Sequence, residues 1–246
     1  EAISAASERL KDYKNITIVK SSYTKIKEVL QNLGIEKITG GVLFDLGASY
    51  HQLTKQERGF SFSKEAPLDM RFDMESDFCA YDVVNYYCEK DLVRIFSEYG
   101  EERFSKRIAK AIVEQRRIEK IKTTVQLADL IVKCTPKIKS KIHPATRVFQ
   151  AIRIEVNHEL QNVKETLEKI IDLLDKGAII SVISFHSLED RIVKHLFKRY
   201  SQYDMGCQSP KLSLVNKKPI VASGEEIKEN QPSRSAKLRV AIKTGS

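Results

Sequence analysis

Seven consecutive residues, Gly41-Val42-Leu43-Phe44-Asp45-Leu46-Gly47, decide the fold class of this chain. The run is mostly apolar, is interrupted by a single acid and closes on a glycine. Short apolar runs of this kind are typical of strands that are buried on both faces of a parallel sheet. A second run, Ala178-Ile179-Ile180-Ser181-Val182-Ile183-Ser184, has the same character. The two runs predict the central strands of an α/β protein.

The segments around these strands alternate between helical and extended patterns, as in a doubly wound sheet. The segment 23–33 has apolar residues at 26, 29, 30 and 33, which is the spacing of a helix face, and Gly34 follows as a cap. Stretches at 15–19 and 236–242 predict further strands. We also expect helices at 2–10, at 145–174 and from 187 onward, with His186 or Ser187 near the cap, and a polar loop over 207–230.

The pattern changes between residues 50 and 142, where strand signals are almost absent. Helices are expected there at 81–88, 91–99, 101–117 and 123–134. Because this stretch separates the two central strands, we interpret it as a helical insertion in the α/β domain.

The composition is that of a globular protein with an excess of positive charge. Among 246 residues, 42 are Lys or Arg and 33 are Asp or Glu, so the formal net charge is +9. This excess favours an anionic partner, most simply a nucleic acid. Charge alone leaves a ribosome-associated binder or a membrane-surface protein open. No apolar run approaches the roughly 18 residues that a membrane span needs, and we expect a cytoplasmic protein without a membrane partner. The four cysteines lack CxxC and zinc-finger spacing, which predicts reduced thiols and no metal site.

Two polar residues follow the central strands, at the edge where ligands bind in open α/β sheets. Asp45 either accepts a hydrogen bond from an amine of a ligand or caps a turn. His186 is a base, a phosphate contact or a structural residue, and the residues alone leave these alternatives open. The chain contains neither GxxxxGK[ST] nor GxSxG, which excludes a P-loop nucleotide hydrolase and argues against acyl hydrolysis.

Basic residues gather in two places. Arg103, Lys106, Arg107 and Lys110 lie at offsets 0, 3, 4 and 7, so they form one stripe of a helix. Lys133, Lys137, Lys139 and Lys141 place four cations within nine residues without an acid, which favours contact with phosphates. The alternative for both clusters is a solvated surface, and acids at 101, 102 and 114 support it for part of the helix.

Longer strings of residues, spread over essentially the whole chain, carry a resemblance to one family. They are FDLG at 44–47, QL at 52–53, ERGFSF at 57–62, PLDMR at 67–71, YGEERF at 99–104, HPATR at 143–147, FQA at 149–151, RIEVN at 153–157, SFHSLEDR at 184–191 and RSAKLR at 234–239. In this order they resemble the bacterial small-subunit ribosomal RNA cytosine-N4 methyltransferases, the RsmH or MraW family.

The resemblance implies a class I methyltransferase fold, which is a Rossmann-like α/β sheet, with an inserted all-helical domain. Residues 1–54 and 144–246 would form the methyltransferase domain, and 55–143 the substrate-recognition domain. The implied reaction is N4-methylation of a cytosine in the decoding region of 16S rRNA. The implied cofactor is S-adenosyl-L-methionine, and the implied partner is small-subunit rRNA or the 30S subunit.

The site residues follow from the resemblance and from the basic clusters. The family's cofactor contacts map onto Tyr23, Asp45 and Gln52, with Tyr23 where the family commonly has Phe. We further expect Asp45, or a backbone carbonyl between Leu46 and Ser49, to accept a hydrogen of the reacting amine. The expected RNA contacts are Arg103, Lys106, Arg107, Lys110, Lys137, Lys139, Lys141 and Arg147 along the backbone, and His186 and Arg191 at the base.

The chain also departs from the family pattern. The Gly-rich turn with Gly-Gly-His and the acid that ends the family's second strand are absent, and Tyr50-His51 replaces a usual Ser-Pro. We therefore expect an N-terminally truncated member, and the alternative function is a catalytically incompetent member that binds RNA or the ribosome. A third interpretation is a methyltransferase for another base or for a protein, against which the strings of the insertion argue.

Overall fold

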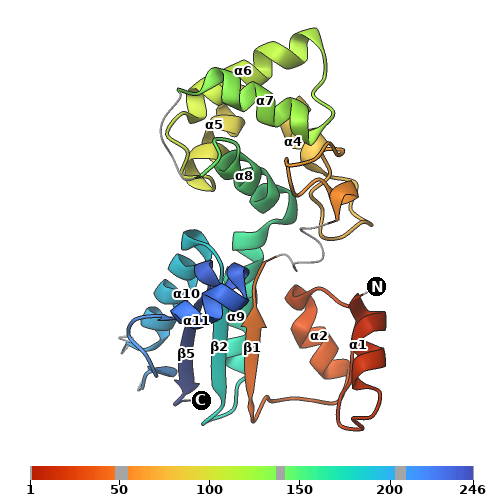
Figure 1. Ribbon diagram of the computed structural model, residues 1–246. Helices are drawn as coiled ribbons and strands as arrows, with labels where there is room; N and C mark the ends of the chain where they lie inside the picture. Colours follow the sequence, from red (N-terminus) through yellow and green to blue (C-terminus); the bar gives the residue numbers. More distant parts are fainter. Residues whose placement is uncertain (1, 48–54, 137–141, 203–208, 246) are drawn as a thin grey trace. The chain divides into compact units, whose positions relative to one another are not determined.

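The computed structural model describes residues 2–47, 55–136, 142–202 and 209–245 (Figure 1). The chain forms two compact units. Glu1–Leu46 together with Gln161–Ser246 carry the sheet and are called the sheet unit below, and Gly47–Leu160 form the helical unit. The helical unit therefore extends beyond residue 143. The assignment of residues 55–143 to a substrate-recognition domain is a statement about function and stays a prediction.

The sheet unit confirms the α/β fold class and the two central strands. Strands β1 (Gly41–Asp45) and β2 (Ile179–Ser184) pair in parallel, and β5 (Lys237–Lys243) pairs antiparallel with β2. The strand order is β1-β2-β5-β3, where β3 is Leu212–Leu214, and β4 (Ile220–Val221) also pairs with β5. The sheet is therefore mixed, with its last strand in chain order running against the two central ones.

The two central strands differ in burial. Ile180 and Val182 of β2 are buried, as expected for a strand between two neighbours. Leu43 of β1 is 66% exposed, and β1 is the last strand on its side of the described sheet. The prediction that both strands are buried on both faces is therefore wrong for β1 among the described residues.

The sheet unit contains helices in most of the segments where the sequence predicted them. Its helices are α1 (Ala2–Leu10), the 3-10 helix η1 (Tyr23–Lys25), α2 (Ile26–Asn32), most of α9 (Glu159–Leu173), α10 (Ser187–Tyr200), α11 (Gly224–Glu229) and the 3-10 helix η3 (Gln231–Ser235). Leu167 and Ile170 of α9 and Val193 of α10 pack in one core with Ile180 and Val182. None of the described helices is long and apolar enough to span a membrane.

Two local predictions in this unit are wrong. Residues 15–19 do not form a strand, and Ile16, Ile18 and Val19 are exposed. β-branched residues favour a strand only where a neighbouring strand supplies hydrogen bonds and a packing surface. The segment expected as a loop over 207–230 instead contains β3, β4 and α11 in its described part, because β5 offers its edge as a partner.

The helical unit contains the four helices that the pattern predicted in the insertion. They are α4 (Ala80–Tyr86), α5 (Glu89–Glu98), α6 (Ser105–Ile118) and α7 (Thr124–Cys134), accompanied by the short η2 (Gln56–Arg58) and by α8 (Thr146–Asn157) (Figure 1). Leu92, Phe96, Ile108, Leu127 and Ile152 are fully buried in its core. The first four residues of the segment 101–117 form a turn before α6 and are not helical.

A single helix over 145–174 was expected, and the structure has two. The chain breaks between α8 and α9 at His158, whose φ of 50° is left-handed. Left-handed residues end helices because the next amide can no longer continue the hydrogen-bond ladder.

Candidate functional site

The carboxyl ends of β1 and β2 meet at one edge of the sheet, because the strands are parallel and in register. Asp45 lies opposite Ile183, and the amide of Leu46 donates to the carbonyl of Ile183 at 3.0 Å. Gly47 then adopts a left-handed φ of 89°, which turns the chain out of the sheet. The Asp45 side chain is exposed at this edge, as the sequence predicted for a ligand-binding position.

An exposed aromatic ring lies next to this strand end. Tyr23 is 40% exposed, and its ring meets that of Phe44 edge to face, with centroids 6.1 Å apart and planes at 84°. Ser22 caps η1 by accepting from the amide of Thr24, which fixes the start of the turn that carries Tyr23. Gln52, the third residue expected at the cofactor, lies outside the described residues.

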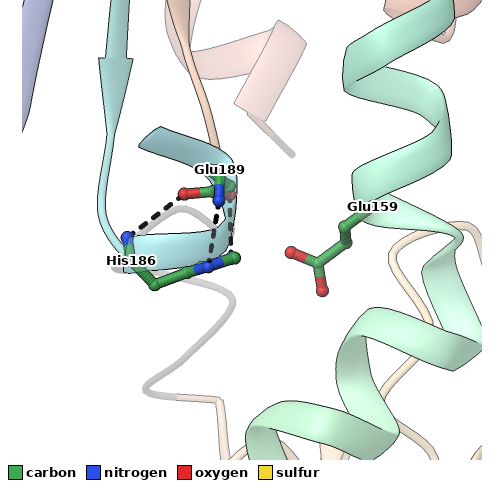
Figure 2. A group of neighbouring side chains, drawn as sticks. All are labelled: Glu159, His186 and Glu189. Atoms are coloured by element: carbon green, nitrogen blue, oxygen red, sulfur yellow. Dashed lines mark hydrogen bonds and ion pairs between the residues drawn. The ribbon is translucent and has the colours of Figure 1, made fainter. Parts of the chain in front are cut away.

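His186 is the N-cap residue of α10, and its side chain takes part in the capping (Figure 2). Its Nδ1 accepts from the amide of Glu189 at 3.4 Å, and Glu189 Oε2 accepts from the amides of Phe185 and His186 at 2.9 and 3.3 Å. This is a capping box with an imidazole in place of a hydroxyl. The third side chain drawn in Figure 2, Glu159, belongs to the helical unit, where Arg153 holds it with two hydrogen bonds of 2.8 and 3.0 Å.

The first turn of α10 is tied to the sheet by a buried ion pair that sequence reasoning missed. Arg239 of β5 donates to Asp190 from Nε at 2.7 Å and from Nη2 at 3.2 Å, and Lys237 lies 3.5 Å from the same carboxylate. Burial pushes the pKa of Asp190 upward, but the hydrogen bonds and charge of Arg239 outweigh it and hold that pKa below its ordinary value. The neighbouring Arg191, expected at the base, is exposed on α10.

The basic stripe of the sequence lies on the solvent side of α6. Arg103, just before the helix, and Lys106, Arg107 and Lys110 within it are all exposed. Ile108 and Ile112 on the opposite face are fully buried. Lys110 lies 3.8 Å from Glu114, an exposed pair that costs little to separate. The stripe therefore presents positive charge to solvent along one helix face.

Arg147 and Arg103 line one pocket of the helical unit. Arg147, at the start of α8, donates from Nη1 to the carbonyl of Glu101 at 3.1 Å. The pocket has a volume of about 110 Å³, and Phe104 and His143 also line it. The lysines expected at the same interface, Lys137, Lys139 and Lys141, lie outside the described residues.

The structure thus gathers the predicted site residues into two groups. Tyr23 and Asp45 lie at one end of β1, in the sheet unit that also holds His186 and Arg191. The α6 stripe and Arg147 lie in the helical unit. Glu102, Phe104 and His143 were not among the predicted contacts, because the pocket that they line joins two segments that are distant in sequence.

Comparison with known proteins gives consistent matches along the chain. The family model described as "MraW methylase family" matches residues 1–244. A relative from Sulfurihydrogenibium sp. (strain YO3AOP1), named "Ribosomal RNA small subunit methyltransferase H", is 55% identical over 242 residues, which are 97% of this chain and 80% of the relative. A relative with the same name from Caldicellulosiruptor bescii is 54% identical over 255 residues, which cover 99% of this chain and 82% of the relative. Another with the same name, from Clostridioides difficile, is 49% identical over 255 residues, which cover 98% of this chain and 81% of the relative.

Proposed function

The chain belongs to the MraW methylase family, and on that premise we propose that it transfers a methyl group from S-adenosyl-L-methionine to N4 of a cytosine in the decoding region of small-subunit ribosomal RNA. The names of its relatives support the substrate class, since these proteins match at least 97% of the chain. The observation that carries the chemistry is the exposed Asp45 at the shared carboxyl edge of β1 and β2.

Tyr23, Asp45 and Gln52 are the residues that we propose to hold the cofactor. The two described residues fit such a ligand, because an exposed aromatic ring is suited to stacking on adenine and a carboxylate to accepting hydrogen bonds from amines and hydroxyls. When bound, S-adenosyl-L-methionine supplies an electrophilic methyl group on a positively charged sulfur. The contact between Tyr23 and Phe44 places the ring beside the strand end that carries Asp45.

The chemistry that we assign to Asp45 follows from the weakness of the nucleophile. The lone pair of the cytosine N4 amine is delocalised into the ring, so this nitrogen attacks poorly by itself. Asp45 would accept a hydrogen bond from the amine, which raises the electron density on nitrogen. It would also take up the proton that the nitrogen loses when the methyl group passes to it from the sulfur, which is left as a neutral thioether. The base must leave its stack to reach a strand edge, since a stacked and paired amine is inaccessible.

The helical unit is proposed to recognise the RNA. The exposed stripe of Arg103, Lys106, Arg107 and Lys110, with Arg147, offers cations to the phosphate backbone. Lys137, Lys139 and Lys141 are proposed for the same role from the sequence. His186 and Arg191 are proposed for the base; His186 would act from its capping position with Glu189, and Arg191 from the exposed side of α10.

Methyl transfer to small-subunit rRNA tests the role of Asp45. We expect Asp45→Asn to lower kcat by about 100-fold or more, in the range of general-base effects, because the amide cannot take up the proton. Asp12→Asn is the matched control, since Asp12 is also an exposed acid of the sheet unit and lies outside the proposed site. Near-normal turnover of Asp45→Asn would remove Asp45 from the mechanism.

A second measurement separates the enzyme from a member that binds RNA without methylating it. Titration calorimetry of the chain with S-adenosyl-L-methionine, compared with Tyr23→Ala, reports the cofactor site directly. We expect saturable binding that weakens in Tyr23→Ala. Retained RNA affinity without any cofactor binding would favour the non-catalytic alternative instead.

A further inference from the structure

We propose that the pocket at the start of α6 and α8 in the helical unit binds one unstacked base of the RNA, with the phosphate of that nucleotide at its two arginines. This proposal rests on the proposed function, because it takes RNA as the ligand. The pocket volume of about 110 Å³ is of the same order as the roughly 150 Å³ cavity that accommodates a benzene ring in a protein interior. It therefore offers room for one ring system and not for a paired helix.

The pocket contains a rigid aromatic platform. The ring of His143 stacks on that of Phe62, with centroids 4.6 Å apart and planes at 27°. Phe62 in turn meets the buried Phe149 edge to face at 4.9 Å. His143 Nδ1 accepts from the amide of Ala145 at 3.2 Å, which anchors the ring at the start of α8. An anchored ring loses little entropy when a base stacks on it, so such platforms favour unstacked bases.

Positive charge surrounds the same pocket. The Arg103 guanidinium lies 5.8 Å from the centroid of the Phe104 ring, and the hydrogen bond of Arg147 to Glu101 fixes the second guanidinium. The helices α6 and α8 both begin at this pocket, and the side chains of their N-cap residues, Phe104 and Ala145, do not cap them. The amides of these two residues donate instead to Glu102 and His143. Helix N-termini carry partial positive charge and favour anions, so two arginines and two helix starts converge on a place for phosphate.

A hydrogen-bond acceptor completes the pocket. Glu102 is 9% exposed, and its Oε1 accepts from the amide of Phe104 at 2.9 Å. A carboxylate has further acceptor sites, which suit the exocyclic amino group or ring N–H of a base. Stacking on an aromatic ring and hydrogen bonds to a base edge are contacts that single-stranded RNA recognition uses, and arginines contact the phosphate. A phosphopeptide would use the arginines but would leave the aromatic platform and the carboxylate without a role.

The pocket wall is built into the fold and does not need a ligand to form. Glu101 has a left-handed φ of 48°, and a Cβ on Gly100 would lie 2.7 Å from the carbonyl oxygen of Arg147. The turn after α5 therefore approaches α8 as closely as a glycine permits. This contact brings the backbone of α8 against the turn, and the hydrogen bonds of Arg147 to Glu101 and of Phe104 to Glu102 hold the two side chains before any RNA arrives.

Equilibrium binding of a decoding-region RNA fragment to the whole chain tests the proposal. We expect His143→Ala to weaken binding by roughly 5- to 100-fold with an unchanged salt slope, because a stacking contact involves no counterions. His143→Phe should restore affinity to within about threefold, since it keeps the ring. Arg147→Ala should weaken binding and also lower the salt slope by about one phosphate. Arg117→Ala, an exposed arginine at the other end of α6, is the control for lost charge outside the pocket.

Photo-crosslinking identifies the contact independently of affinity. The same fragment, with 5-iodouridine at each single-stranded position in turn, should crosslink at one position to the tryptic peptide 142–147, and His143→Ala should abolish that product. The proposal is overturned if RNA binds but His143→Ala behaves like Arg117→Ala and the peptide carries no crosslink; the proposed function would then stand without the pocket. If the unaltered chain binds no RNA, the proposed substrate class fails and the pocket proposal fails with it.

Discussion

Removing the negative charge of Asp190 is expected to destabilise the sheet unit strongly. The side chains of Asp190 and Arg239 are 12% and 9% exposed, and two hydrogen bonds of 2.7 and 3.2 Å join them. In Asp190→Asn, the guanidinium of Arg239 stays buried but loses its negatively charged partner. Breaking one side of a buried ion pair costs about 3–5 kcal/mol, because the remaining charge is left uncompensated.

Replacing both partners should cost much less than replacing one. The double variant Asp190→Leu with Arg239→Met removes both charges and their desolvation, and such replacements are often neutral or stabilising by about 1–4 kcal/mol. We therefore expect the double variant to be more stable than either single variant. Asp172→Asn is the control: Asp172 also pairs with a lysine, Lys211 at 2.8 Å, but is 61% exposed, so its loss should cost at most about 1 kcal/mol.

Hydrogen exchange of the peptides that cover α10 and β5 measures this free energy within the sheet unit alone. A loss of 3–5 kcal/mol accelerates exchange from the globally open state by about 100-fold or more. The reasoning would be refuted if each single variant lost less than about 1 kcal/mol of unfolding free energy. It would also be refuted if the losses of the two single variants added up in the double variant, since additive losses mean that the two charges do not interact.

The same pair sets a dependence on pH. The pKa of Asp190 in the folded protein lies below its ordinary value of 3.8. Its contribution is therefore fully present above about pH 4 and is lost as the pH falls through the folded-state pKa. The stability difference between the parent chain and Asp190→Asn should stay constant from pH 7 to pH 5 and narrow below pH 4.

Three further predictions concern the helical unit. Gly100→Ala should cost about 1–3 kcal/mol in thermal unfolding, because its Cβ would lie 2.7 Å from two carbonyl oxygens, whereas Gly224→Ala, in open space, should cost nothing or stabilise slightly. Tyr87→Phe should cost about 1–2 kcal/mol at pH 7 by removing the 2.8 Å hydrogen bond to Glu155. Burial and that bond raise the pKa of Tyr87 above its ordinary value of 10.0, so the parent chain but not the variant should lose this contribution above pH 10. Thr123→Ala should cost about 1 kcal/mol, measured by urea unfolding, because it removes the side-chain cap of α7.

Sequence patterns predicted those parts of the fold in which local preference and tertiary packing agree. The apolar runs at 41–47 and 178–184 became β1 and β2, and the position of Asp45 at a strand end followed directly from them. The β-branched stretch at 15–19 has the same local preference but pairs with no described strand. Strand propensity alone does not specify a partner, so it could not distinguish these cases.

The candidate site divides in the same way. The basic stripe of α6 is a property of one helix, so its spacing was visible in the sequence. The pairing of Asp190 with Arg239 and the pocket of Glu102 and His143 join segments that are about 40 to 50 residues apart. Such arrangements depend on how close two elements lie after folding, and no local periodicity encodes that distance.

The break between α8 and α9 shows most clearly why a local pattern can mislead. Apolar residues recur at helical spacing on both sides of it, so periodicity predicts one helix over 145–174. The side chain of Asn157 opposes this continuation: it donates to the carbonyls of Met70 and Arg153 at 2.8 Å each and accepts from the amide of Phe72 at 2.6 Å. Two of these partners lie more than 80 residues upstream. The left-handed turn at His158 is therefore a consequence of tertiary hydrogen bonds that hold the end of α8, and Asn157→Ala should weaken this hold without altering the apolar pattern that suggested a single helix.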